Sequence, residues 1–236
     1  MLRGIYSGAT ALDNYTQQQE AISSNLAHLN TPGYRRQLLA FQEKLAPGSD
    51  TETRPGTSIH TLVTDFESGT KKTTGRRLDL AINGDGFFTY EGVGENVFSK
   101  NGIVFRSPNG ELVNGDGFAL LDEGARIVIP ESVSNRDLVV TADGQISANG
   151  ETFGRISLTR FDDPQLLDNE SQVYFKLGEA TASPAEDSTI VQGARELANA
   201  QPVSELVSLI VGSRSFESAQ RAIRTISDAI QENLRT

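Results

Sequence analysis

The spacing of apolar residues changes twice along this chain, and this change constrains the fold more than any other feature. Over residues 5–29, and again over residues 203–234, apolar side chains recur at intervals of three and four. From about residue 60 to 180 they alternate at intervals of two. Intervals of three and four are typical of a helix that packs on another helix, and an interval of two is typical of a strand. The pattern predicts an α+β fold: paired long N- and C-terminal helices, coiled-coil-like, with a central all-β domain of short antiparallel strands.

The first helix is predicted over residues 5–29, with a sharp end. Asn30 tolerates the left-handed conformation of a C-cap, Pro32 forces the preceding residue into an extended conformation, and Gly33 can take a positive φ. The seam of this helix is incomplete, because it includes a glycine and a glutamine. It consists of Ile5, Gly8, Leu12, Tyr15, Gln19, Ile22, Leu26 and Leu29.

The second helix is predicted over residues 203–234. Pro202 suits a first helical turn, and Asn199 and Gln201 are the two candidates for the cap before it. Neither helix can bury its apolar stripe alone, so we expect the two to pack together or on the same partner. Its apolar row recurs every seven residues at Leu209, Phe216, Ile223 and Ile230, and is flanked by Leu206, Ile226 and Leu234.

Turn dipeptides separate the short apolar runs of the middle region. Asn-Gly or Asp-Gly occurs at residues 83–84, 101–102, 109–110, 114–115, 143–144 and 149–150, and these dipeptides are the strongest local signal for a hairpin. Two polar stretches that contain proline are typical of linkers. The predicted domains are an N-terminal helix and assembly motif over 1–43, a linker over 44–59, a β domain over 60–180, a linker over 181–192 and a C-terminal helix over 193–236.

Composition excludes several classes of protein. Without Cys there is no disulfide framework, no thiolate nucleophile and no Cys-based metal centre. The two histidines, His28 and His60, are too few for a three-histidine metal site. The formal net charge of −10 argues against nucleic acid as a partner, because a phosphate backbone is bound by a basic surface.

The motifs of enzymes and cofactor-binding proteins are missing or incomplete. Residues 92–97 begin like a dinucleotide-binding loop without its last glycine, and residues 83–86 and 114–117 lack the ligand order of a calcium loop. Turns explain all three segments. The sequence therefore predicts no catalytic residue, no cofactor and no metal.

The sequence predicts no membrane insertion and no cleavable signal peptide. The densest apolar run, residues 206–211, is far shorter than the roughly 20 residues that span a bilayer. Arg3 is basic, but the polar residues 17–20 interrupt any apolar segment behind it. Taken alone, this predicts a cytoplasmic protein, although a protein exported without a cleavable signal would look the same. The lack of Cys leaves an oxidising compartment open, because it removes any risk of wrong disulfides.

Three segments carry motifs in a recognisable order. Residues 23–36 read SSNLAHLNTPGYRR, residues 74–88 read TGRRLDLAINGDGFF, and residues 196–207 read ELANAQPVSELV. They resemble the N-terminal signature, the entry to the β domain and the C-terminal motif of the bacterial flagellar axial proteins, the family of rod, hook and hook-associated proteins. The chain departs from the family pattern at His28, where Asn is preferred, and at Ala198 and Ala200, which replace Ser and Val.

Within that family, the short length and the opening residues 1–6 look most like a flagellar basal-body rod protein of the proximal or distal type. The resemblance implies a structural subunit, not an enzyme, that polymerises through its terminal helices into the torque-transmitting axial shaft. It implies partners: other copies of the chain, neighbouring rod or hook proteins, and the flagellar type III export apparatus. It also implies a place in the periplasm-spanning rod of the flagellum basal body, reached without a cleavable signal peptide.

Two alternatives stay open at this point. One is a sibling role as a hook or hook-associated subunit. The other belongs to a different class: a β-sandwich carbohydrate-binding or hydrolase domain that dimerises through helical arms. The second alternative predicts a pocket with convergent carboxylates of perturbed pKa.

We expect the assembly interface to lie on the two helices and on the motif that follows the first helix. Its predicted residues are Ile5, Leu12, Tyr15, Ile22, Asn25, Leu26, Asn30, Thr31, Gly33, Tyr34, Asn199, Val203, Leu206, Leu209, Phe216, Ile223, Ile226 and Ile230. The charge distribution agrees with this assignment. Residues 1–45 carry a net charge of +1 and residues 203–236 a net charge of zero, whereas residues 46–202 carry −11. Helices that pack between copies therefore need not repel one another.

Overall fold

A computed structural model describes the backbone of residues 2–43 and 58–233, and the side chains of residues 8–40 and 61–229. The chain divides into two compact units. The first, here called the helix unit, comprises Met1–Ala27, Arg36–Asp65 and Ala200–Thr236. The second, the β unit, comprises His28–Arg35 and Phe66–Asn199. The protein is thus α+β, with a helix near each end of the chain and a β region between them, as the sequence predicts.

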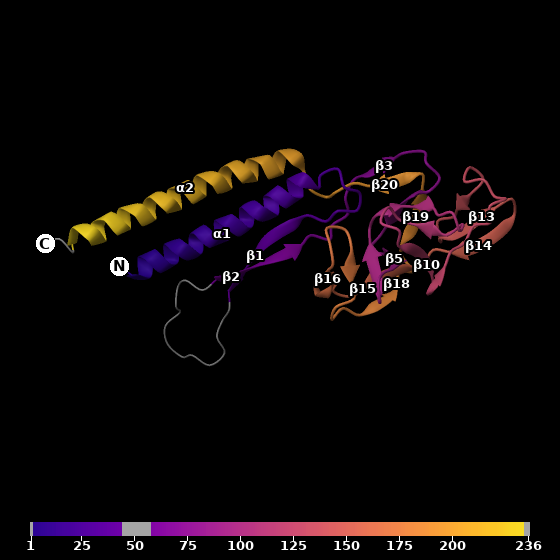
Figure 1. Cartoon of the computed structure of the whole chain (residues 1–236), viewed down its shortest axis with the longest axis horizontal. Helices are drawn as coiled ribbons and strands as arrows, with labels where there is room; N and C mark the ends of the chain where they lie inside the picture. Colours follow the sequence, from indigo (N-terminus) through magenta and orange to yellow (C-terminus); the bar gives the residue numbers. More distant parts are fainter. Residues whose placement is uncertain (1, 44–57, 234–236) are drawn as a thin grey trace. The chain divides into compact units, whose positions relative to one another are not determined.

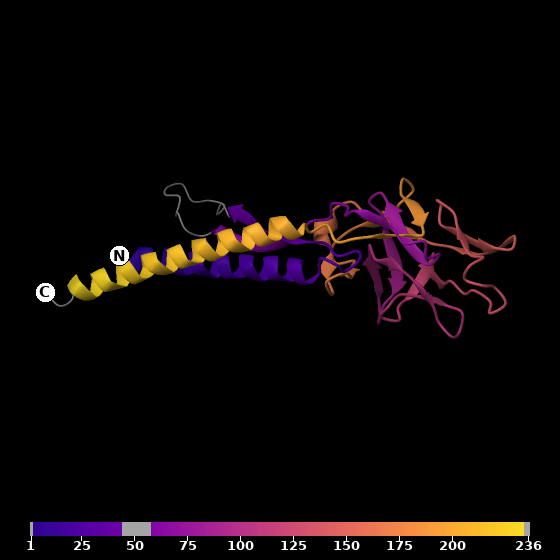
Figure 2. The same ribbon diagram turned by 90° about the horizontal axis from the view of Figure 1, so that it is seen from above.

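The helix unit contains two long helices and a pair of strands. Helix α1 spans Leu2–Ala27 and helix α2 spans Pro202–Asn233. Figures 1 and 2 show the two helices side by side, running in opposite directions. Strand β1 (Gln37–Glu43) pairs with strand β2 (Ser58–Thr64) in antiparallel register, from Gln37 opposite Thr64 to Glu43 opposite Ser58.

The ends of the helices lie close to the positions that the apolar spacing predicts. The C-terminal helix domain expected over residues 193–236 is wrong at its start, because Ala194–Glu196 form a strand and the helix begins at Pro202. Helix α1 stops two residues before the predicted end, where the amide of Thr31 donates to the carbonyl of His28 at 2.9 Å and turns the chain. Gly33 follows with φ at +73°, as its place in the predicted helix stop requires. Helix α2 starts at Pro202, and the amide of Glu205 donates to the carbonyl of Gln201.

Strands β1 and β2 are an addition to the predicted layout. The sequence predicts a helix and assembly motif over residues 1–43 and a linker over residues 44–59. Residues 44–57 lie outside the described part of the chain, and the last two residues of that linker belong to β2. The adjacent apolar residues Leu38 and Leu39 break the alternation by which a strand is recognised, so the pattern does not reveal β1.

The β unit consists of short antiparallel strands. They are β3 (Lys71–Thr73), β4 (Asp79–Asn83), β5 (Phe87–Glu91), β6 (Asn96–Ser99), β7 (Gly102–Ile103), β8 (Phe105–Arg106), β9 (Leu112–Val113), β10 (Ala119–Asp122), β11 (Ala125–Arg126), β12 (Val139–Val140), β13 (Gln145–Ala148), β14 (Glu151–Arg155), β15 (Leu158–Phe161), β16 (Asp168–Asn169), β17 (Phe175–Lys176), β18 (Ala182–Pro184), β19 (Thr189–Gln192) and β20 (Ala194–Glu196), with a 3₁₀ turn η1 (Pro164–Leu166) before β16. The largest sheet has ten strands, with the order β16-β17-β6-β5-β10-β9-β8 along its main path. Smaller sheets have the orders β12-β13-β14, β19-β4-β7 and β20-β3.

Four of the predicted turns join paired strands. The dipeptides at residues 109–110, 114–115, 143–144 and 149–150 connect β8 to β9, β9 to β10, β12 to β13 and β13 to β14. At the last of these, Asn149 and Gly150 both have positive φ, as a two-residue hairpin turn requires.

The dipeptide at residues 101–102 does not form a hairpin. Gly102 begins β7, whose partner is β4. A side chain at this position would lie 2.1 Å from the carbonyl oxygen of Leu80 and 2.5 Å from the ring of Phe88. Glycine is needed here for close packing, not for a turn.

The stretch 181–192, predicted as a linker, contains strands β18 and β19. Strand β19 pairs with β4, and Pro184 of β18 lies opposite Thr159 of β15. Proline can occupy such a position because β18 has only one partner strand and therefore lies at a sheet edge. A polar composition with proline thus describes an edge strand as well as a linker.

Two apolar clusters form the core of the β unit. The larger includes Leu80, Phe88 and Tyr90, together with Ile127 and Ile129, which are buried although they lie between strands. The smaller is aromatic and combines rings such as Phe87, Phe98, Phe161 and Phe175. The β unit therefore has a core of its own.

Candidate assembly interface

Helices α1 and α2 pack in a regular antiparallel register. A side chain at Gly8 would lie 2.6 Å from Cγ1 of Ile223, and one at Gly212 would lie 4.0 Å from the amide oxygen of Gln18. Farther along, the side chain of Asn25 contacts that of Glu205. The glycine that weakens the predicted seam is therefore the point where an isoleucine of the other helix fills the space.

The helix pair buries few side chains. Of the described side chains of α2, residues 202–229, only that of Glu205 is buried. Of those of α1, residues 8–27, the buried ones are Ala21, Ile22 and Asn25, all near its C-terminal end. A long helix owes most of its stability to the packing of an apolar face, so contacts within this one chain leave much of the helix pair without that support.

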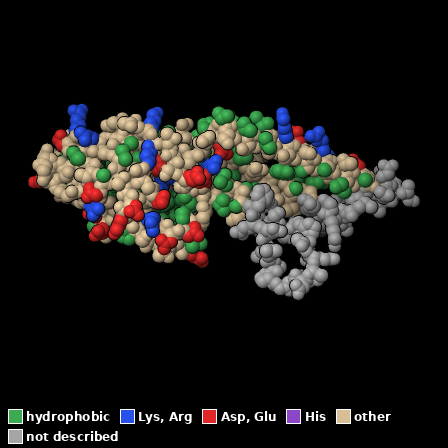
Figure 3. All heavy atoms as spheres, turned by 180° about the vertical axis from the view of Figure 1, so that it is seen from behind, with side chains coloured by type: hydrophobic (Ala, Val, Ile, Leu, Met, Phe, Trp, Pro, Cys, Tyr) green, Lys and Arg blue, Asp and Glu red, His purple; other side chains and the backbone are tan. Residues whose placement is uncertain are grey.

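An apolar stripe lies on the outward face of α2, in its first half. Its five aliphatic side chains are all at least half exposed, and Val203 is 75% exposed. Their spacing of three, one, three and one places them on one face of the helix. Figure 3 shows hydrophobic side chains on this part of the helix surface. We call Val203, Leu206, Val207, Ile210 and Val211 the α2 stripe.

The same face of α2 becomes polar after the stripe. Helical spacing places Arg214, Glu217, Ser218, Arg221 and Asp228 on it, and all five are exposed. The apolar surface is thus confined to residues 203–211. Isolated exposed aliphatic residues are ordinary, whereas a contiguous exposed patch marks an interaction site.

A buried polar cluster links α1, β1 and α2. The side-chain amide of Asn25 donates to the carbonyl of Gln37 at 3.0 Å and to Oε2 of Glu205 at 3.3 Å. In return, its oxygen accepts the amide of Gln37 at 2.8 Å. Asn25 is only 1% exposed. Because these hydrogen bonds form only in one alignment, they fix the axial register of the three elements.

The motif after α1 is anchored in the β unit. The rings of His28 and Tyr34 stack with centroids 5.0 Å apart, and Tyr34 is buried. The amide of Gly33 donates to the carbonyl of Glu196 at 3.0 Å. A side chain at Gly33 would lie 2.3 Å from the amide nitrogen of Asn101, so only glycine fits.

Arg35 and Glu196 form an ion pair at 2.7 Å, and neither side chain has any exposed surface. The same carboxylate oxygen accepts the amide of Gly69 at 2.8 Å. Nearby, the ammonium of Lys100 donates to the carbonyl of Gly84 and lies over a phenylalanine ring. Burial, followed by repulsion from Arg35, lowers the pKa of Lys100 to about 8.

The predicted interface residues fall into three groups. Exposed are Asn30, Val203 and Leu206; half-buried are Leu12, Tyr15, Leu26, Thr31, Asn199, Leu209, Phe216, Ile223 and Ile226; buried are Ile22, Asn25, Gly33 and Tyr34. The side chains of Ile5 and Ile230 lie outside the described residues. Asn199, a candidate cap, donates its side-chain amide to the carbonyl of Glu67 instead. The α2 stripe also includes Val207, Ile210 and Val211, which the sequence prediction does not name, although their spacing relative to Val203 is a readable signal in the sequence.

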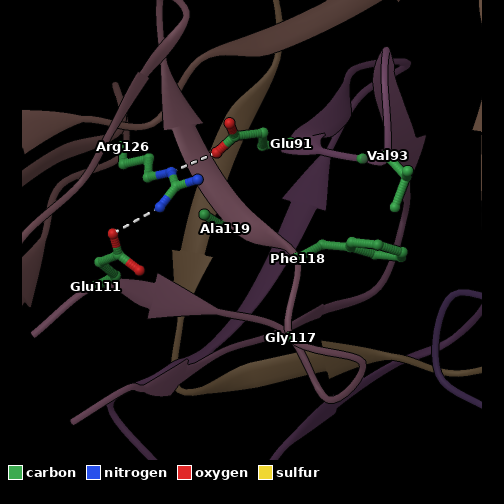
Figure 4. Close-up of a pocket in the computed structure, with 8 residues that line it drawn as sticks. Glu91, Val93, Glu111, Gly117, Phe118, Ala119 and Arg126 are labelled. Carbon is green, nitrogen blue, oxygen red and sulfur yellow. Dashed lines mark hydrogen bonds and ion pairs between the residues drawn. The ribbon is translucent and has the colours of Figure 1, made fainter. Parts of the chain in front are cut away.

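A small cavity of about 180 Å³ in the β unit does not resemble a hydrolytic site. Figure 4 shows the guanidinium of Arg126 (β11) between the carboxylates of Glu91 (β5) and Glu111. Its hydrogen bond to Glu91 lowers the pKa of that carboxyl group. A general acid needs a raised pKa, so this arrangement is suited to an ion pair, not to proton transfer.

Within the described residues, no three or more His, Cys, Asp or Glu side chains are grouped in a way that could hold a metal ion. The helices of that same part of the chain are all too short or too polar to cross a membrane.

The chain matches three family models along its length. Residues 5–35 match the flagella basal body rod protein family, residues 81–148 match the D1 domain of the flagellar hook protein FlgE/F/G family, and residues 191–235 match the C-terminal region of flagellar basal body rod FlgEFG proteins. These segments overlap all three motifs and contain most of both helices.

Curated relatives match over nearly their whole length. The flagellar basal-body rod protein FlgG of Bacillus subtilis is 29% identical, over 98% of each chain. FlgF of Caulobacter vibrioides is 30% identical, over 94% of this chain and 92% of its own. FlgF of Salmonella typhimurium is 28% identical, over 97% and 95%. The fold, the motifs and these matches agree: the chain belongs to the family of flagellar basal-body rod proteins.

Proposed function

We propose that this chain is a structural subunit of the rod that polymerises through α1 and α2 into the torque-transmitting shaft. The observation that carries the proposal is the helix pair, which buries few of its own side chains and exposes the α2 stripe. Apolar surface in this position is stabilised when a neighbouring copy covers it. The proposal assigns a mechanical role and needs no catalysis.

The packing proposed for α1 on α2 is coiled-coil-like. It is supported by the seven-residue spacing of Leu209, Phe216 and Ile223, all half-buried, and by the close approach of Ile223 to Gly8. In this arrangement each helix uses one face for its partner within the chain. The opposite face of α2 is then available to another copy.

Polymerisation into a shaft needs an interface between subunits that does not generate a closed ring. A head-to-tail interface joins two different surfaces of the same subunit and generates a helical array when the rotation leaves the ring open. The partners that follow are other copies of the chain and neighbouring rod or hook proteins. Delivery by the flagellar export apparatus, without a cleavable signal peptide, belongs to the same proposal.

Deletion of the gene, followed by electron microscopy of isolated basal bodies, tests this function. We expect truncated rods and loss of motility, both restored by the wild-type gene on a plasmid. Basal bodies with full-length rods and normal motility in the deletion strain would contradict the proposal. A strain that carries the Ile210→Asp variant then asks whether the α2 stripe is the part that matters.

A further inference from the structure

A basic edge stands out on the β unit, which is otherwise acidic. The unit contains 13 Lys or Arg and 21 Asp or Glu, a net charge of −8. Residues 71–77, by contrast, hold four cations and no carboxylate. Strand β3, within this segment, pairs with β20. We call Lys72, Arg77 and Arg195 the basic edge.

The cations of the basic edge lack partners within the described part of the chain. Lys72 lies directly opposite Arg195 in the register of β3 and β20. Like charges at such a position destabilise a strand pair, and no described carboxylate lies within ion-pair distance of either. Nε of Arg195 is buried without a hydrogen-bond partner.

An acidic edge lies on the other side of the same unit. Residues 162–179 carry five carboxylates and only one cation, Lys176. Asp163, Asp168 and Glu179 are exposed, and none of them takes part in an ion pair with a described residue. Figure 1 places β3 and β20 at one edge of the β unit and β15, β16 and β18 at the opposite edge. Figure 3 shows Asp and Glu side chains gathered along one edge of this unit.

We infer that the β units of adjacent copies dock side by side, with the basic edge of one against the acidic edge of the next. Opposite charges on opposite edges make a head-to-tail contact, which can repeat without closing. The like-charged pair of Lys72 and Arg195 then gains carboxylate partners in the assembly. This inference rests on the proposed function and adds a second contact to the one made by the helices.

Charge reversal in cells is the first test, with rod length in electron micrographs as the measurement. Lys72→Glu is expected to reduce full-length rods about tenfold or more, because it sets like charges against each other in every contact. Adding Glu179→Lys should restore them. Adding Glu151→Lys, the same charge change on an exposed residue of β14 outside both edges, should not. A thermal melt of the purified full chain checks that Lys72→Glu folds.

Cysteine crosslinking is the second test, and it reads the contact directly because the chain has no Cys of its own. The variant with Lys72→Cys and Glu179→Cys, treated with a short bis-maleimide in assembled rods, should give a ladder of covalent multimers. The matched variant with Lys72→Cys and Glu151→Cys should give no ladder beyond dimers.

Three results would overturn the inference. The first is a normal number of full-length rods in the Lys72→Glu strain. The second is that Glu179→Lys restores rods in the Lys72→Glu background no better than Glu151→Lys does. Binding of the full chain to vesicles of anionic phospholipid through Lys72, with rod assembly unchanged, would assign the basic edge to a membrane instead. The proposed function fails by a different result, normal rods in the deletion strain, so the two outcomes are distinguishable.

Discussion

Asn25 and Glu205 lie 180 residues apart in the chain, yet the side-chain amide of one donates to a carboxylate oxygen of the other inside the helix unit. Both side chains are buried, at 1% and 5% exposure. Asn25 belongs to the N-terminal motif and Glu205 to the C-terminal motif. Two of the three segments that carry the family motifs are therefore in direct contact, and the contact involves the only buried residue among the described side chains of α2.

Replacing Asn25 by leucine should destabilise the helix unit by about 2–3 kcal/mol, because the carboxylate of Glu205 and the backbone of Gln37 lose their partner while buried. The measurement is urea unfolding of the full chain, followed by the helical circular dichroism signal. Thr16→Val on the exposed side of α1 is the control. An unchanged unfolding midpoint for Asn25→Leu would mean that the polar cluster does not fix the register.

Gly8 should tolerate no large side chain, because even a Cβ would lie 2.6 Å from Cγ1 of Ile223. We expect Gly8→Leu to abolish rod assembly, although leucine is the better helix former. Adding Ile223→Ala to Gly8→Leu should restore part of the rod assembly, because the smaller alanine leaves room for the leucine side chain. Rod length and motility are the readouts. The matched control is Gly8→Leu with Ala222→Gly, which leaves Ile223 in place and should not restore assembly.

A charged residue placed in the α2 stripe should prevent assembly and leave the fold of the single chain intact. Ile210→Asp adds a charge to a side chain that is 55% exposed in the single chain, so the melting temperature should change little. In an assembled contact the same charge is buried without a partner, which is strongly unfavourable. Ser218→Asp adds the same charge on the same helix face, beyond the stripe, and should assemble normally. If the two variants behave alike, the stripe is not an interface.

The sequence predicts most of this architecture, because periodicity and turn chemistry are local properties. The helices, the hairpin turns at Asp143 and Asn149 and the helix stop at Gly33 all follow from residues close in the chain. The linker expected over residues 181–192 instead contains two strands, β18 and β19, because their pairing partners β15 and β4 come from distant segments of the chain. Two-residue strands such as β8 are also too short for any pattern to reveal.

The sequence is less informative about the proposed interface than about the fold. A seven-residue row identifies the face of α2 that packs on α1, and the row by itself does not separate this face from the surface that we propose is available to other copies. Burial separates them: Leu209 and Phe216 are half-buried, whereas Val207 and Ile210 are exposed. The motif also predicts Asn25 and Tyr34 as interface residues. Both are buried inside the chain, so we expect any effect of changing them on assembly to act through the fold.

Two consecutive arginines should differ greatly in their importance for stability. Arg35 pairs with Glu196 without any exposed surface, whereas Arg36 pairs with Asp65 with both side chains partly exposed. Removing one partner of a buried ion pair leaves an uncompensated charge, which costs about 3–5 kcal/mol, while a partly exposed pair contributes about 1 kcal/mol or less. Arg35→Met should therefore lower the urea midpoint of the β unit far more than Arg36→Met lowers that of the helix unit, which holds both Arg36 and Asp65. Equal decreases in the two midpoints would contradict the burial of Arg35.

The stability of the β unit should rise between pH 8 and pH 10. Burial lowers the pKa of Lys100 from its ordinary value of 10.5 to about 8, so in this range the unfolded chain binds more protons at Lys100 than the folded chain does. Stability increases with pH wherever the unfolded state binds more protons. Above about pH 10 the slope should reverse, because burial raises the pKa of Tyr90 and the folded state then retains a proton that the unfolded state loses.

Urea unfolding of the full chain at half-unit intervals of pH measures the slope. Lys100→Met should remove the rise between pH 8 and 10 and leave the decline above it. A rise that persists in this variant would assign the titration to another group.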